Sequence, residues 1–166
     1  MRASVVICGA VIRDPNTGTT SPNDTAPKRH PKFIGSYRFF PGVGFYKFYK
    51  FKVPWGDAWA QCRDDNAHLV VIDSEKELEV VKLLQIQAKS KDWCHIGVHD
   101  LYLNTRYITV LDEEFTPSSF NKWNQNEPTN NAAENCVGVL PTGFLGDLGC
   151  GTALPFICEY EVPEIS

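Results

Sequence analysis

The sequence predicts an α+β fold, with two helices and several short strands around one core and a long polar loop between cysteines. Helical spacing of apolar residues occurs twice, after Pro54 and after Ser74, and short aromatic or β-branched runs flank both segments. The last third of the chain places carboxylates between cysteines that can cross-link the loop holding them. With 166 residues, 43% of them hydrophobic, the chain can bury one sizeable core. We therefore expect a single domain with a tail.

The N-terminal part differs from the rest in composition. Residues 1–12 combine Arg2 with an apolar run and resemble an incomplete secretory signal, although a simple apolar leader explains them equally well. Residues 13–42 are assigned to a flexible basic arm rich in Pro, Thr and Asn, with a glycosylation sequon at Asn23. Within this arm, the dense aromatic residues that begin at Phe33 also favour short strands around a turn. No other segment approaches the length of a membrane span.

Charge is divided unevenly along a chain whose net charge is −4. Residues 1–52 carry nine Lys or Arg against two Asp, whereas the remainder carries seven basic and 18 acidic residues. A basic tail that keeps an acidic domain in solution is one explanation. The other is a basic strip around Lys47, Lys50 and Lys52 for anionic surfaces such as a bacterial envelope or sulfated glycans. The acidic domain has no interleaved Arg and aromatic residues, which argues against nucleic acid as a partner.

Both helices have local start signals. The first is expected to begin near Pro54, a residue favoured in the first turn, and to stop at Asn66. Its buried face is predicted by the i, i+3, i+4, i+7 spacing of Trp55, Ala58, Trp59 and Cys62. The second opens with a capping box, in which Ser74 caps the Glu77 amide and the Glu77 side chain reaches back to the Ser74 amide. This helix is expected to end near Ala88.

Strands are expected over residues 67–72, 92–98 and 107–110, where β-branched and aromatic side chains gather. Gly97 in the second of these allows another backbone to approach closely. Residues 111–142 are turn-rich and polar, and a loop of that length persists in a compact domain only if it has a function. We expect Trp123 to pack on the core at the base of this loop rather than to stack on a ligand.

Acidic residues and cysteines in the last third suggest a cation site in a cross-linked loop. Glu127, Glu134 and Asp147 are the only acids between Glu114 and Glu159. Calcium takes six to eight hard oxygen ligands, and a loop gathers them only when its ends are held rigidly. The six cysteines lack the spacing of zinc ligands, so a disulfide framework and an oxidising compartment are favoured.

The order of these features resembles the C-type lectin domain over residues 43–161, with residues 162–166 as a tail. Within that family the sequence is similar to insect haemolymph lectins that bind lipopolysaccharide, the immulectin-like group. The motifs behind the resemblance are Ala67-His68-Leu69, Ile96-Gly97-Val98-His99-Asp100 and Phe156-Ile157-Cys158-Glu159. The resemblance implies two helices, two small antiparallel sheets and a long ligand loop clipped by a disulfide. It also implies that Cys62 pairs with Cys158 and Cys136 with Cys150, which leaves Cys94 as a buried free thiol.

The same resemblance implies which residues bind Ca2+ and a sugar. Glu127, Thr129, Glu134 and Asp147 occupy the family's metal-binding and sugar-binding positions, and the Glu127–Pro128 bond is expected to be cis. Thr129 and Gly146 replace two asparagines of the family's pattern, so the calcium site is partly degenerate. Restoring both amides, by Thr129→Asn with Gly146→Asn, is expected to strengthen binding of calcium and of mannose-type sugars.

These implications define two functional hypotheses. The first is a secreted, extracellular carbohydrate-binding protein that recognises microbial surface glycans or lipopolysaccharide in innate immunity, a pattern-recognition lectin with Ca2+ as cofactor. The second is a calcium-independent lectin-like module that binds a protein or an anionic surface, including a role in immune evasion. An enzyme is disfavoured, because the chain has no Ser/His/Asp order, Gly-rich phosphate loop or His-Glu metal motif. An oligomer is compatible with the sequence.

Overall fold

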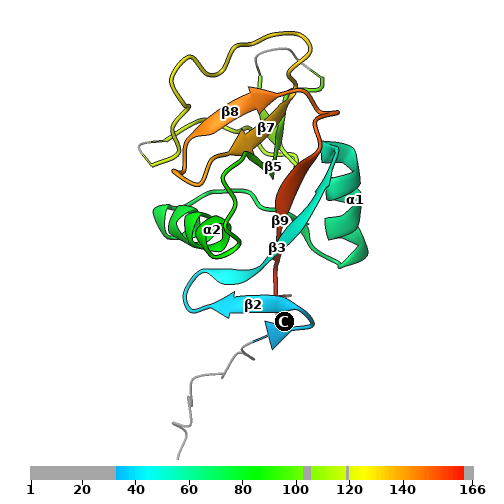
Figure 1. Ribbon diagram of the computed structural model, residues 1–166, viewed down its shortest axis with the longest axis vertical. Helices are drawn as coiled ribbons and strands as arrows, with labels where there is room; N and C mark the ends of the chain where they lie inside the picture. Colours follow the sequence, from blue (N-terminus) through cyan, green and yellow to red (C-terminus); the bar gives the residue numbers. More distant parts are fainter. Residues whose placement is uncertain (1–32, 103–105, 119, 163–166) are drawn as a thin grey trace, which may run out of the picture.

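The structure, a computed structural model, describes residues 33–102, 106–118 and 120–162. It contains two helices, α1 (Trp55–Asp64) and α2 (Glu75–Gln87), and confirms the α+β class (Figure 1). The strands are β1 (Phe33–Ile34), β2 (Tyr37–Phe40), β3 (Gly44–Val53), β4 (His68–Leu69), β5 (Cys94–His99), β6 (Ile108–Thr109), β7 (Cys136–Val139), β8 (Leu145–Leu148) and β9 (Leu154–Tyr160). None of the helices in the described ranges is long and apolar enough to span a membrane.

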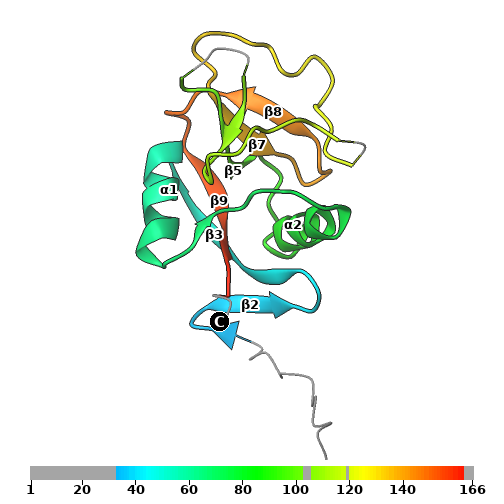
Figure 2. The same cartoon turned by 180° about the vertical axis from the view of Figure 1, so that it is seen from behind.

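The strands form one mixed sheet in the order β1-β2-β3-β9-β5-β7-β8, with β4 paired to β9 and β6 to β5. All these pairs are antiparallel except β5–β9, which run parallel with His95 opposite Phe156. The two separate antiparallel sheets of the prediction are therefore joined into one through this parallel pair. Figures 1 and 2 show the long β3–β9 pair below and the β5, β7 and β8 strands above, next to the long loop.

The two helices lie on opposite sides of the β3–β9 pair, as both views show (Figure 2). Alternate residues of β3 point to opposite faces, so each face has its own apolar cluster. Tyr46 and Phe48 pack in the cluster that includes α2, whereas Phe45 and Tyr49 pack in the cluster that includes α1.

Helix α1 begins directly after Pro54, and Asn66, with a φ of 56°, lies just beyond its end, as predicted. Its face toward the sheet is the predicted one, because Trp55, Ala58 and Cys62 are buried there. Trp59 is half-buried and packs against the same cluster. The spacing of these residues on the helix was sufficient to identify the buried face, since it depends only on the helical repeat.

The capping box of α2 forms only in part. Ser74 Oγ accepts a hydrogen bond from the Glu77 amide at 3.2 Å, as predicted. The Glu77 carboxylate, however, accepts from the Asp73 amide at 2.8 Å and not from that of Ser74. Its second oxygen accepts from the Tyr46 hydroxyl at 2.8 Å, which draws the side chain under the sheet.

Several predicted strands and one domain boundary differ from the structure in extent. Residues 67–72 form only the two-residue strand β4, and the chain then continues through single bonds such as Val70 N–Ile157 O at 2.9 Å. The segment 33–42, which the predicted domain boundaries assign to the flexible arm, carries β1 and β2, because Tyr37 and Phe40 are buried against the core. Gly97 has the expected close approach: a Cβ there would lie 2.5 Å from the Leu69 carbonyl oxygen.

The disulfides are those that the resemblance implies. Cys62 bonds to Cys158 and Cys136 to Cys150, and Cys94 is a buried free thiol. The first bridge ties α1 to β9 across the sheet, and the second connects β7 to the segment after β8. The predicted signal segment, the arm up to residue 32 and the sequon at Asn23 lie outside the described residues.

Candidate functional site

The base of the long loop is fixed beside β8 around Trp123. The Asn124 amide donates to the Leu145 carbonyl at 2.7 Å, and the Leu145 amide donates to that of Lys122 at 2.8 Å. Trp123 packs against the core cluster, and its ring centroid lies 5.0 Å from that of Tyr107. The prediction that Trp123 packs at the base of the loop is confirmed, and this anchoring holds the following turn next to β8.

Asp147 on β8 is the centre of that turn. Its side chain is 1% exposed, and its two oxygens accept the Thr129 and Asn130 amides, each at 2.8 Å. Burial alone would raise the pKa of this carboxyl, but hydrogen bonds from the Glu127 side chain and from these amides outweigh it and hold the pKa below its usual value. Asp147 therefore stays ionised and fixes the two residues after the Glu127–Pro128 bond, which is cis as expected.

Thr129 connects the remaining acids of the loop. Its hydroxyl donates to Glu134 Oε2 and also lies 3.4 Å from Asp147 Oδ2. The Tyr107 hydroxyl lies 3.4 Å from the same Asp147 oxygen on the inner side. Tyr107 could not be assigned to this site from the sequence, since its position depends on the pairing of β6 with β5.

Glu127 has one unsatisfied oxygen. Its Oε2 atom is buried and accepts no hydrogen bond within the described part of the chain. Burial, together with the neighbouring Asp147 and Glu134 carboxylates, raises the pKa of Glu127 to about 7. The carboxylates of Glu127, Glu134 and Asp147 thus lie close enough to affect one another.

The predicted residues fit a hard cation in charge and in ligand type. Calcium prefers carboxylate and neutral oxygen ligands, and Glu127, Glu134, Asp147 and the Thr129 hydroxyl supply both. In the described ranges, however, no three acidic, His or Cys side chains are arranged as a formed metal site. Asp147 accepts hydrogen bonds from the Thr129 and Asn130 amides, and Glu134 accepts one from the Thr129 hydroxyl. These residues therefore offer suitable oxygen ligands for a cation, but several of those oxygens are hydrogen-bonded within the loop.

Gly146 has a structural role that the sequence analysis missed. A Cβ at this position would lie 2.6 Å from Cη2 of Trp93, whose indole covers the strand. Gly138, directly opposite on β7, also lies beneath this ring. The predicted Gly146→Asn restoration therefore requires the Trp93 side chain to move. No left-handed backbone conformation is involved, so space alone is limiting.

This contact predicts that Gly146→Ala destabilises the domain by about 1–3 kcal/mol, the usual range for overpacking. Chemical denaturation of the variant and of Trp93→Leu/Gly146→Ala measures the effect, and the second change should recover part of the loss. Gly56→Ala is the matched control, because a Cβ there meets nothing within 4 Å and alanine favours a helix. Equal stabilities for Gly146→Ala and Gly56→Ala would contradict the contact.

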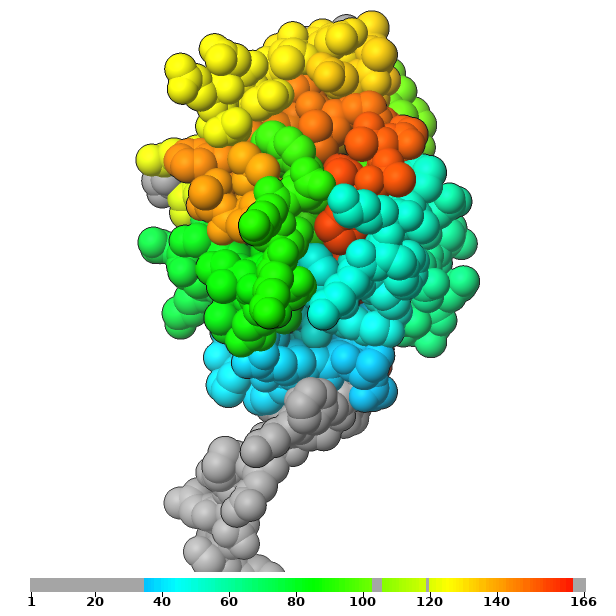
Figure 3. Space-filling view, viewed as in Figure 1, coloured from blue at the N-terminus to red at the C-terminus, as the bar shows by residue number. Residues whose placement is uncertain are grey.

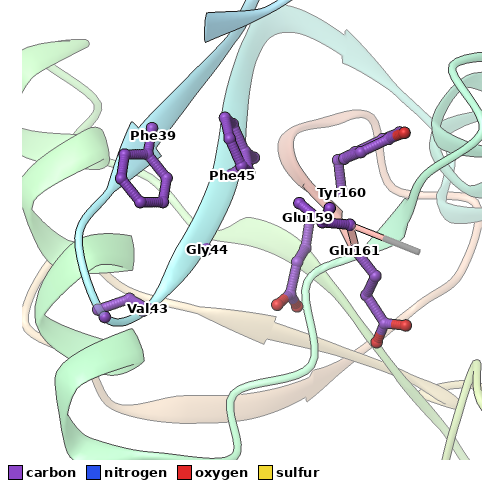
Figure 4. A pocket seen from close by; sticks show the side chains of 9 residues that line it. Phe39, Val43, Gly44, Phe45, Glu159, Tyr160 and Glu161 are labelled. Atoms are coloured by element: carbon purple, nitrogen blue, oxygen red, sulfur yellow. The ribbon is translucent and has the colours of Figure 1, made fainter. Parts of the chain in front are cut away.

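A separate hollow of about 510 Å³ lies at the other end of the molecule, between the β2–β3 turn and the end of β9. Figure 4 shows Phe39 and Val43 on one side of it and Glu159 and Glu161 on the other, with both carboxylates pointing the same way. It shares no residue with the group formed by Glu127, Thr129, Glu134 and Asp147, which we call the carboxylate loop. None of the residues that line the hollow was predicted to bind a ligand.

The model of the lectin C-type domain matches residues 51–160, which is most of the described fold. The chain belongs to the C-type lectin domain family. Domains of this family are non-enzymatic carbohydrate-binding domains. The disulfides and the cis proline bond are those that the resemblance implies.

The chain is also similar to individual proteins and solved structures. The hemolymph lipopolysaccharide-binding protein of Periplaneta americana is 32% identical over 88% of this chain and 59% of its own length. The mouse scavenger receptor C-type lectin carbohydrate-recognition domain is 25% identical, with a TM-score of 0.68 over 78% of this chain and 97% of that one. Human lithostathine, at 20% identity over 83% and 99%, has the same fold with a TM-score of 0.68. The chain spans about three fifths of the length of the curated relatives it matches.

Proposed function

We propose that this C-type lectin domain belongs to a secreted, extracellular protein of innate immunity that binds microbial surface glycans or lipopolysaccharide through Ca2+. The residues that would hold the ion are Glu127, Thr129, Glu134 and Asp147. The observation that supports this most is the buried Glu127 Oε2, which has no hydrogen-bond partner among the residues that the structure describes and lies beside two further carboxylates. The cockroach relative, named as a lipopolysaccharide-binding protein, supports the ligand class.

The residues of the chain divide the task between them. Asp147 holds the backbone of Thr129 and Asn130, so the turn is formed before a ligand arrives. Glu127 and Glu134 supply the negative charge, and their oxygens can accept hydrogen bonds from sugar hydroxyls. Bound Ca2+ would supply coordination for two neighbouring sugar hydroxyls and would neutralise the three acids.

A calcium-independent lectin-like module remains the alternative, and Gly146 favours it. In this chain the position carries no side chain and is covered by Trp93, so an amide ligand cannot be offered there. A domain of this kind would bind a protein or an anionic surface, with an immune-evasion role among the options.

Thermal unfolding with calcium or with chelator separates these two functions. A ligand that binds only the folded state at 100 times its Kd stabilises that state by about 2.7 kcal/mol, so calcium should raise the unfolding temperature by several degrees. Glu127→Gln should abolish the rise, because it removes a charged ligand. Glu113→Gln, which neutralises an exposed acid near the start of the long loop, should keep it.

Binding to mannan, a neutral glycan, completes the test. We expect binding in calcium that chelator and Glu127→Gln both remove. No thermal shift and no mannan binding in calcium would contradict the calcium-dependent function and favour the alternative.

A further inference from the structure

A second hollow, of about 310 Å³, lies between strand β3 and the segment that follows α2. Four lysines surround it: Lys50 and Lys52 from β3, and Lys89 and Lys91 from the α2–β5 connection. Figure 3 looks onto this face, where the green segment after α2 and the cyan β3 border a depression. Ser90 also lines the hollow, and Phe48 and Pro155 give it an apolar part. We call this site the lysine groove.

Strand geometry explains why only part of the predicted basic strip contributes. Lys50 and Lys52 are two residues apart and point to the α2 side, in line with Phe48. Lys47 points to the other side, where its Nζ lies 3.6 Å from Asp65 Oδ2 and 4.0 Å from the Tyr49 ring centroid. The predicted strip of Lys47, Lys50 and Lys52 is therefore wrong for Lys47, and Lys89 and Lys91 complete the group instead.

The α2–β5 connection is shaped to bring its lysines to this groove. After the helix, Lys89 adopts a left-handed conformation with a φ of 56°, and the Ser90 amide returns to the Gln85 carbonyl at 2.9 Å. Glycine is the usual residue at such a helix end, because it has no Cβ to strain. A lysine at this position provides a charge where local stability favours glycine.

The groove has a strong excess of positive charge. Among its described lining residues the only acid is Asp92, whose Oδ2 lies 3.0 Å from Lys52 Nζ. The side chains of all four lysines are exposed, so they can close on an anion. A volume near 300 Å³ is at the small end for ligand sites and suits one phosphorylated sugar rather than a long glycan.

We propose that the lysine groove binds phosphate groups of a bacterial glycolipid, independently of calcium. Lysine ammonium groups and the Ser90 hydroxyl would bind the phosphate, and the apolar side of the groove would contact the sugar ring. The choice of a glycolipid rests on the proposed function, whereas the phosphate site rests on the lysines alone. No residue of the groove belongs to the carboxylate loop, so the two sites can be tested separately.

The test measures binding to immobilised rough-type lipopolysaccharide in chelator, beside the same material after enzymatic dephosphorylation. We expect binding only to the phosphorylated form, weakening as salt rises. Lys50→Gln/Lys89→Gln should weaken it about tenfold or more, since hydrogen bonds to charged groups contribute enough for that factor. The calcium-dependent binding of this double variant to mannan should not change, because mannan binding reports on the carboxylate loop.

The matched control is Lys76→Gln/Lys122→Gln, which removes the same charge from exposed positions outside the groove. It should change affinity less than twofold. Equal losses in both double variants would overturn the proposal in favour of net charge alone, as would equal binding to dephosphorylated lipopolysaccharide. Inorganic phosphate that competes as well, mole for mole, as the phosphorylated glycolipid would overturn the glycolipid assignment. A failure of mannan binding alone would count against the calcium site and leave the groove supported.

Discussion

Replacing both Cys62 and Cys158 by alanine should lower the free energy of unfolding by about 4–5 kcal/mol, the largest effect we expect from a change at one place. The bridge spans 96 residues, so in the unfolded chain it removes much of the entropy of a long loop. Both cysteines are 0% exposed, and alanine avoids leaving a buried thiol or hydroxyl in their place. Urea unfolding of the folded variant, with free energies extrapolated to water, measures the loss.

The second disulfide provides the matched comparison. Cys136 and Cys150 are 14 residues apart, and a loop of that size corresponds to about 3 kcal/mol on the same scale. Cys136→Ala/Cys150→Ala should therefore cost less stability, while it loosens the connection between β7 and the segment after β8. If it cost more than Cys62→Ala/Cys158→Ala, loop entropy would not explain the contribution of the bridges.

Local patterns identified the helices because a helix is largely defined by residues near each other in sequence. The spacing from Trp55 to Cys62 gave the buried face of α1, and Ser74 marked the first turn of α2. Gly97 was also predictable, since glycine in a strand signals a close backbone approach. The alternation of strand residues was equally visible, and it could have separated Lys47 from Lys50 and Lys52.

Other features depend on residues far apart in the chain, which no local pattern reports. Trp93 lies over Gly146, which comes 53 positions later in the chain, so an indole ring fills the space that an asparagine side chain would need. Tyr107 reaches Asp147 only because of the order of strands in the sheet. The residues of the carboxylate loop came from the resemblance to a family, while the hydrogen bonds that occupy Asp147 came from the structure.

The contacts of the Glu77 side chain also join residues far apart in the chain, and they raise the pKa of a buried carboxyl in the core. The Tyr46 hydroxyl lies 2.8 Å from Glu77 Oε1 and 3.1 Å from Glu159 Oε1. A phenol has one hydrogen and cannot donate fully to two carboxylates, so a proton on one carboxyl completes the group. Burial, followed by the charge of Glu159, raises the pKa of Glu77 to about 9. The pKa of Glu159 is also raised, chiefly by burial.

This group predicts that the domain loses stability as pH rises from 5.5 to 8, and that Glu77→Gln removes a large part of that loss. The folded protein holds a proton on Glu77 up to about pH 9, whereas the unfolded chain releases it near the ordinary pKa of glutamate. Its stabilising contribution is therefore complete below the unfolded pKa and decreases as pH rises toward the folded pKa. One proton corresponds to about 1.4 kcal/mol per pH unit, or roughly 3 kcal/mol over this range.

Glutamine keeps the shape of the side chain and carries no proton to lose. Its carbonyl can accept from the Asp73 amide, and its amide can donate to the Tyr46 hydroxyl, which then donates to Glu159. Urea unfolding at four pH values should give a slope for Glu77→Gln that is much flatter than that of the wild type. Glu79→Gln, an exposed position on the same helix, should retain the wild-type slope. The two proteins differ only at Glu77. If the free energy of unfolding depended on pH equally in the wild type and in Glu77→Gln, the proton would be held by another residue.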